Sequence, residues 1–92
     1  MPNISGEDIE LTNDGKTAYI SSTGFQRALY KVDLTNYTSS ILSSNDIGNG
    51  IQLSNPSELA FDEKHQRVFM MDYGAIILVD ILTGDRIIFS KK

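Results

Sequence analysis

Acidic and polar side chains occupy matching places in the two halves of this 92-residue chain. Asp8 and Glu58 lie fifty positions apart, each just before an apolar run, and Glu7, Asn55 and Ser57 lie next to them in the sequence. Carboxylate and amide oxygens are ligands that hard cations such as calcium prefer. Whether these five side chains meet in one ligand or cation site depends on the elements that carry them.

Asp72 is a further candidate, because it ends an apolar run just before Tyr73-Gly74. Its carboxylate either faces the same site as the other acids or binds backbone N–H groups in the turn that follows, as aspartate commonly does. We favour the turn interpretation. Asp33 and Asp80 also precede predicted turns, and we expect both to accept hydrogen bonds from turn N–H groups.

His65 is the only histidine, and it lies in the polar segment DEKHQR. A two-histidine metal site would need a second chain, and the sequence offers no catalytic triad. We therefore expect His65 to be a solvated loop residue. Arg86 is close in sequence to Asp80 and Asp85, and we expect it to form a surface ion pair with one of them.

Charge and composition argue against several classes of function. The net charge is −4 and the isoelectric point is near 4.7, which argues against binding to nucleic acid or to an anionic membrane surface. The chain has no cysteine, so it has no disulfide, no thiol nucleophile and no cysteine-ligated zinc. The longest apolar run, residues 75–79, is too short to span a bilayer.

An internal repeat defines the elements that must position the candidate residues. LTNDGKTAYISS aligns with FDEKHQRVFMMD at an offset of 50, and VDLTNYTSSILS aligns with VDILTGDRIIFS at an offset of 47. Three extra residues in the first copy, Phe25-Gln26-Arg27, account for the change of offset and fall in a predicted loop. Two similar structural units therefore follow each other along the chain.

Each copy contains four short runs with the composition of β-strands, separated by turn residues such as Asn13-Asp14-Gly15 and Thr83-Gly84-Asp85. No segment keeps the apolar period of a helix. The predicted strands are residues 9–11, 17–21, 28–34 and 39–43 in the first copy, and 58–61, 67–72, 75–81 and 86–90 in the second. The fold class is therefore all-β, with two four-stranded antiparallel units.

Four antiparallel strands repeated every 40–50 residues or so are typical of a β-propeller blade. A blade packs between neighbouring blades and is apolar on both faces, as the run at residues 75–79 is. We predict one blade in residues 1–46 and a second in residues 47–92, within one structural domain. A small β-sandwich or barrel is the alternative, but it does not explain the repeat.

The second copy resembles a blade of the NHL-repeat type, and the whole chain is similar to bacterial SMP-30/gluconolactonase-like propellers of that type. The matching residues are Pro56, Leu59-Ala60-Phe61-Asp62, Arg67-Val68-Phe69-Met70-Met71-Asp72, Gly74, Val79-Asp80 and Thr83-Gly84. The first copy departs from this pattern, with Gly6 in the place of Pro56 and Ser22 in the place of Asp72. The resemblance also implies a periplasmic or extracellular location.

The resemblance gives the acidic residues a shared position. The first strand of a propeller blade is innermost and starts at a mouth of the central channel, so Asp8 and Glu58 would join a ring of carboxylates there. In the lactonases of this family, acidic and amide side chains of several blades hold a divalent metal, which polarises the substrate carbonyl. The alternative is that these acids are solvated loop or cap residues. Because the remaining ligands would come from other blades, we expect no cofactor in this chain, with a divalent cation such as calcium as the alternative.

Two blades do not close a ring, because propellers contain about four to eight. We expect either further blades in a longer chain or self-association, as a head-to-tail trimer of six blades. The predicted function is a non-catalytic module for ligand or protein binding and scaffolding. A metal-dependent lactonase or related hydrolase and a trimeric propeller lectin are the alternatives, although the absence of tryptophan weighs against a lectin.

Overall fold

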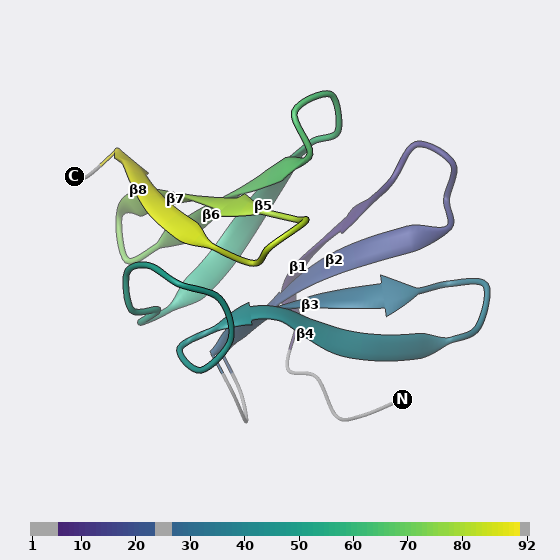
Figure 1. Ribbon diagram of the computed structural model, residues 1–92, viewed down its shortest axis with the longest axis horizontal. Coiled ribbons are helices and arrows are strands. Elements are labelled where there is room, and N and C mark those ends of the chain that lie inside the picture. The colour runs from purple at the N-terminus through teal and green to yellow at the C-terminus, as the bar shows by residue number, and fades with distance from the viewer. Residues whose placement is uncertain (1–5, 24–26, 91–92) are drawn as a thin grey trace.

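The computed structural model describes residues 6–23 and 27–90, so Phe25 and Gln26 of the predicted insertion lie outside the described residues. The described chain forms two four-stranded antiparallel sheets, each with its strands in sequence order (Figure 1). The first sheet contains β1 (Gly6–Leu11), β2 (Thr17–Ser22), β3 (Ala28–Asp33) and β4 (Thr38–Ser44). The second contains β5 (Pro56–Asp62), β6 (Arg67–Asp72), β7 (Ala75–Asp80) and β8 (Arg86–Ser90).

The predicted all-β class with two four-stranded antiparallel units is confirmed. No helix in the described part of the chain is long and apolar enough to cross a membrane. The predicted boundary after residue 46 falls in the linker, residues 45–55, that joins β4 to β5. Both first strands begin earlier than predicted, at Gly6 and Pro56, because each ladder continues through a register shift to pair these residues with Ser22 and Asp72.

Aspartate side chains shape the turns after the third strands, as predicted. Asp33 Oδ1 accepts hydrogen bonds from the hydroxyl (2.6 Å) and the N–H (2.9 Å) of Thr35, and these bonds lower the pKa of Asp33. Asp80 Oδ1 accepts a hydrogen bond from the N–H of Leu82 at 2.8 Å. The repeated aspartates therefore serve the same local purpose in both sheets.

A hydrophobic core lies between the two sheets. Its buried members are Tyr19 and Leu29 from the first sheet, Leu53 from the linker, and Leu59, Val68, Met70, Ile77 and Val79 from the second. The rings of Tyr19 and Phe61 meet across this interface, with their centroids 5.1 Å apart. β5 lies beside β1 and β2, so the first strands of the two sheets are neighbours (Figure 1).

Arg86, at the start of β8, fastens the linker to the second sheet. Its side chain is buried and donates hydrogen bonds to the carbonyl oxygens of Ser44 (2.6 Å), Ile51 (2.8 Å) and Ile47 (3.0 Å). It also donates to Ser43 Oγ at 2.8 Å. Burial lowers the pKa of Arg86, and the negative charge of Asp85 opposes this shift. A guanidinium remains charged in such a site, so these oxygens surround a buried cation.

The predicted surface ion pair of Arg86 with Asp80 or Asp85 is therefore wrong. The guanidinium lies among neutral oxygens of the end of β4 and of the linker, and Asp85 Oδ1 instead accepts a hydrogen bond from the N–H of Asn49 at 2.8 Å. The linker folds back over the start of β8, so that carbonyl groups distant in sequence surround a side chain that the local sequence places at the surface.

Glycines allow the linker to lie directly against the second sheet. A Cβ at Gly50 would collide with the carbonyl of Arg86, and a Cβ at Gly84 would collide with the carbonyl of Leu42. Both glycines also have positive φ, 126° and 82°, which other residues rarely adopt. Glycine is therefore required where the linker approaches β8 and where the β7–β8 turn approaches β4.

Replacing Arg86 with methionine is expected to lower the free energy of unfolding by about 3 kcal/mol, since several linker carbonyls would stay buried without donors. Arg86→Lys should recover part of this loss, because an ammonium group keeps the charge but not the planar fork. Urea unfolding followed by far-ultraviolet circular dichroism measures both.

Arg67→Met is the matched control, because Arg67 makes a partly exposed ion pair with Asp62 at 2.9 Å. Its loss should be below about 1 kcal/mol. Equal losses for Arg86→Met and Arg67→Met would contradict the assigned role of Arg86.

Candidate functional site

All six residues predicted from the sequence lie at one end of the two sheets, where β1 and β5 begin and β2 and β6 end. They are Glu7, Asp8, Asn55, Ser57, Glu58 and Asp72. Their surroundings differ, however, and the six do not form a single cluster. The structure instead distributes them among the sheet interface, the linker and an exposed sheet face.

Asp8 connects the first strands of the two sheets. Its Oδ2 accepts a hydrogen bond from the N–H of Leu59 in β5 at 2.8 Å, and its Oδ1 accepts one from the N–H of Ile9 at 2.8 Å. Both carboxylate oxygens are therefore engaged by backbone groups. This arrangement makes Asp8 part of the contact between the sheets.

Asp72 is buried, with 5% of its surface exposed, and it holds the end of the linker. Its Oδ2 accepts a hydrogen bond from the N–H of Ser54 at 2.9 Å, and its Oδ1 accepts one from the N–H of Asn55 at 2.6 Å. The expectation that Asp72 binds backbone N–H groups agrees with these contacts. These N–H groups belong to the linker before β5, however, and not to the turn after β6.

The other predicted residues lie apart from each other. The carbonyl of Ser57 accepts a hydrogen bond from the Ser21 hydroxyl, across the sheet interface. Glu58 is exposed and borders an apolar hollow on the second sheet. Glu7 is exposed and accepts a hydrogen bond from the Thr23 hydroxyl at 3.3 Å. A ring of carboxylates built from Glu7, Asp8 and Glu58 stays a prediction.

The acidic side chains at this end of the described chain do not gather into one group. In residues 6–23 and 27–90, no group of three or more His, Cys, Asp or Glu side chains could hold one. Asp8 and Asp72, the acids nearest the sheet interface, use their oxygens for backbone N–H groups.

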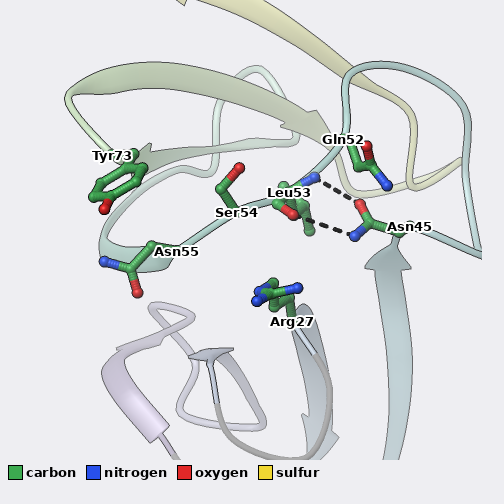
Figure 2. Close-up of a pocket in the computed structure, with 7 residues that line it drawn as sticks. All are labelled: Arg27, Asn45, Gln52, Leu53, Ser54, Asn55 and Tyr73. Atoms are coloured by element: carbon green, nitrogen blue, oxygen red, sulfur yellow. Dashed lines mark hydrogen bonds between the residues drawn. The ribbon is translucent and has the colours of Figure 1, made fainter.

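An open cavity of about 610 Å³ lies at the same end, between the linker and the loops of both sheets (Figure 2). Arg27 contributes from the residue before β3, Tyr73 from the β6–β7 turn, and the remaining residues from the linker. The lining residues are Arg27, Asn45, Gln52, Leu53, Ser54, Asn55 and Tyr73. Asn55 is the only one of them among the six candidates.

Two side chains hold the floor of the cavity in place. Asn45 pairs with the backbone of Leu53, accepting its N–H at 2.6 Å and donating to its carbonyl at 3.2 Å (Figure 2). Asp72 binds the next two N–H groups, as described above, and the Leu53 side chain is buried in the core. The linker is thus anchored from both sides at the point where it lines the cavity.

The cavity combines one cation with neutral polar groups. The described lining residues contribute the Arg27 guanidinium together with amide and hydroxyl side chains, and none of them carries a carboxylate. The Tyr73 side chain is 84% exposed, and Figure 2 shows its ring at the edge of the cavity. A guanidinium pairs with carboxylates, while amides and hydroxyls bind hydroxyl groups, so this lining suits an anionic polyhydroxylated ligand.

The described residues that line the cavity do not place a histidine or a carboxylate beside its serine. A serine is activated as a nucleophile by an adjacent base, and Ser54 has no such neighbour among the described lining residues. His65 lies at the tip of the β5–β6 hairpin, where its Nδ1 is 2.9 Å from Asp62 Oδ2. It is exposed, in agreement with its prediction as a loop residue.

Comparisons with protein-family models, with curated proteins and with solved structures find no match for this chain. The resemblance to NHL-repeat and SMP-30/gluconolactonase-like propellers therefore stays a prediction.

The sequence contained one signal for the cavity that the prediction did not use. Arg27 belongs to the three-residue insertion that distinguishes the first copy from the second, and binding residues are concentrated in loops. Asn45, Gln52 and Ser54 gave no such signal, because they lie in a linker whose polar composition is typical of any connection.

Replacing Asp72 with alanine is expected to lower the free energy of unfolding by about 2 kcal/mol, because two backbone N–H groups would lose their acceptor. The amide signals of Ser54 and Asn55 should also move in ¹H–¹⁵N spectra. Asp46→Ala removes an exposed carboxylate of the same linker and should change neither quantity appreciably. An Asp72→Ala protein as stable as Asp46→Ala would contradict the anchoring role.

Proposed function

We propose that this chain is a non-catalytic binding module of the β-propeller type, in which each four-stranded sheet is one blade. The repeat in sequence, the strand order of both sheets and the neighbouring first strands support this assignment. The packing of the two sheets also supports this assignment, because one sheet contributes one face of the repeated unit and the other sheet contributes the opposite face.

The ligand that fits the cavity is a small molecule with a carboxylate and several hydroxyl groups, such as a sugar acid. The observation that carries this proposal is the described lining, in which Arg27 is the only charged residue and the polar groups are amides and hydroxyls. Its guanidinium would pair with the carboxylate, and linker groups such as Gln52 and Ser54 would bind the hydroxyls. The exposed ring of Tyr73 offers a flat apolar surface for the C–H groups of a sugar.

Catalysis is not part of the proposal. The lactonase alternative requires a metal held by several acidic or amide side chains, and the acids at this end of the described chain do not supply such a set. The lectin alternative shares one feature with the proposal, since the tyrosine ring at the edge of the cavity suits a sugar. A sugar acid satisfies both this ring and the guanidinium.

The test compares D-galacturonate with D-galactose, which differ in the carboxylate alone, by titration in ¹H–¹⁵N spectra. Galacturonate should move the amide signals of Gln52, Ser54 and Asn55 and should bind about tenfold more tightly than galactose, as expected for one charge-assisted pair. Arg27→Gln should remove this difference in affinity, and Tyr73→Ala should lower the affinity for both sugars.

Lys64→Gln is the matched control, because it removes an exposed positive charge at the distant β5–β6 hairpin tip. It should leave both affinities unchanged. The proposal fails if the two sugars give equal shifts, if Arg27→Gln keeps the preference for the acid, or if no cavity signal moves.

A further inference from the structure

Each sheet has one face without a partner in the described chain. On the first sheet, Ile9, Ile20, Tyr30 and Ile41 pair in register across all four strands and therefore share a face. This face, which we call the free face of the first sheet, also carries Leu11. Its β1 edge is exposed, with Ile9 and Leu11 at 54% and 55%, whereas Tyr30 in the same row is buried.

The second sheet has a free face as well. Ala60, Phe69, Leu78 and Ile87 pair in register across its four strands, so this row is apolar throughout. Phe89 packs edge-on against Phe69, with the ring centroids 5.6 Å apart. Ile87 and Phe89 are each 60% exposed. An apolar hollow of about 380 Å³ lies on this face, between β5, β6, β7 and β8.

The interface inside the chain uses the repeat equivalents of these two free faces. The first sheet turns the row of Glu10, Tyr19, Lys31 and Ser40 toward the second sheet. The second sheet turns the row of Leu59, Met70, Ile77 and Ile88 toward the first. The repeat offsets of 50 and 47 relate these rows to the free faces. The row that begins with Glu10 is equivalent to the free face of the second sheet, and the row that begins with Leu59 is equivalent to the free face of the first sheet.

The two free faces are therefore the two halves of an interface that the chain already forms once. We propose that copies of this chain associate head to tail, with the free face of the second sheet of one copy covering the free face of the first sheet of the next. This contact would reproduce the packing between the two sheets of one chain. It rests on the repeat and the packing alone, and it does not depend on the ligand proposed for the cavity.

Specific contacts of the internal interface predict their counterparts between copies. The ring of Tyr19 packs on Phe61 within the chain, so Phe69 of one copy would pack on Leu11 of the next. Asp8 accepts the N–H of Leu59 at 2.8 Å. Its repeat equivalent, Glu58, would accept the N–H of Ile9 in the next copy. Glu58 thus acquires a role at the interface between copies.

A head-to-tail contact uses two different surfaces, so it either closes into a ring or continues into a filament. Three copies would bring six sheets around one axis, within the range of about four to eight blades in known propellers. We therefore expect a closed trimer, and the wild-type protein should show three times its chain mass of 10.2 kDa. Size-exclusion chromatography with light scattering at micromolar concentration measures this mass.

Two double variants each disable one face. Ile9→Lys with Leu11→Lys places charge on the free face of the first sheet, and Ile87→Lys with Phe89→Lys does so on the second. All four side chains are more than half exposed, so the fold of the single chain should persist. Each variant alone should be a monomer. Tyr37→Lys with Leu82→Lys, which alters exposed turn residues outside both faces, should remain a trimer.

Mixing the two face variants is the decisive measurement. Each variant keeps one intact face, and the intact faces are complementary, so the mixture should form a 1:1 dimer and nothing larger. Unfolded chains could not give this result, so the dimer also demonstrates that both variants fold. A monomeric wild type, a face variant that remains a trimer, or a mixture that remains monomeric would overturn the proposal. Titrating the monomeric variants with galacturonate tests the cavity separately.

Discussion

The buried guanidinium of Arg86 is the interaction on which the join between the two sheets depends. A cation removed from water must receive hydrogen bonds from its surroundings, because an unpaired buried charge is strongly destabilising. Here the oxygens come from the end of β4 and from the linker, so the charge is satisfied only when the linker folds back over β8. The Ser43 hydroxyl, which accepts from Arg86, also donates to the carbonyl of Gly84 at 2.6 Å and extends the network into the β7–β8 turn.

This constraint determines where the cavity can form. Once Arg86 fixes the first half of the linker, the second half has only a short path to the start of β5. Asn45 and Asp72 bind the backbone along that path, and Leu53 enters the core between the sheets. Linker side chains such as Gln52 and Asn55 are left to line the open space beside Arg27. The buried Arg86 guanidinium of the second sheet thus positions the polar lining of the cavity, which lies between the two sheets.

Features of the fold that depend on local sequence patterns could be predicted from the sequence. Alternating apolar residues and turn residues such as Asp33 and Asp80 located the strands and connections, and the repeat predicted two like sheets. The partners of Arg86 and Asp72 could not be predicted, because they are backbone groups of a linker whose path no local pattern specifies. The candidate residues lie at the end of the sheets where the cavity opens, and Asn55 is the one among them that the described lining includes.

Equivalent rows of the two sheets differ in polarity. In the first sheet, the row on the face toward the second sheet includes Glu10, Lys31 and Ser40, and only Tyr19 of this row is buried. The equivalent row of the second sheet is apolar throughout, and yet it has no partner in the described chain. Burial of apolar surface stabilises a protein by about 25 cal/mol per Å², so the more apolar row gains more from being covered.

Because the cavity lies at the end of the sheets and the free faces lie along their sides, an additional sheet could cover those faces without filling the cavity. Ligand binding and assembly would therefore use separate surfaces of the same repeat.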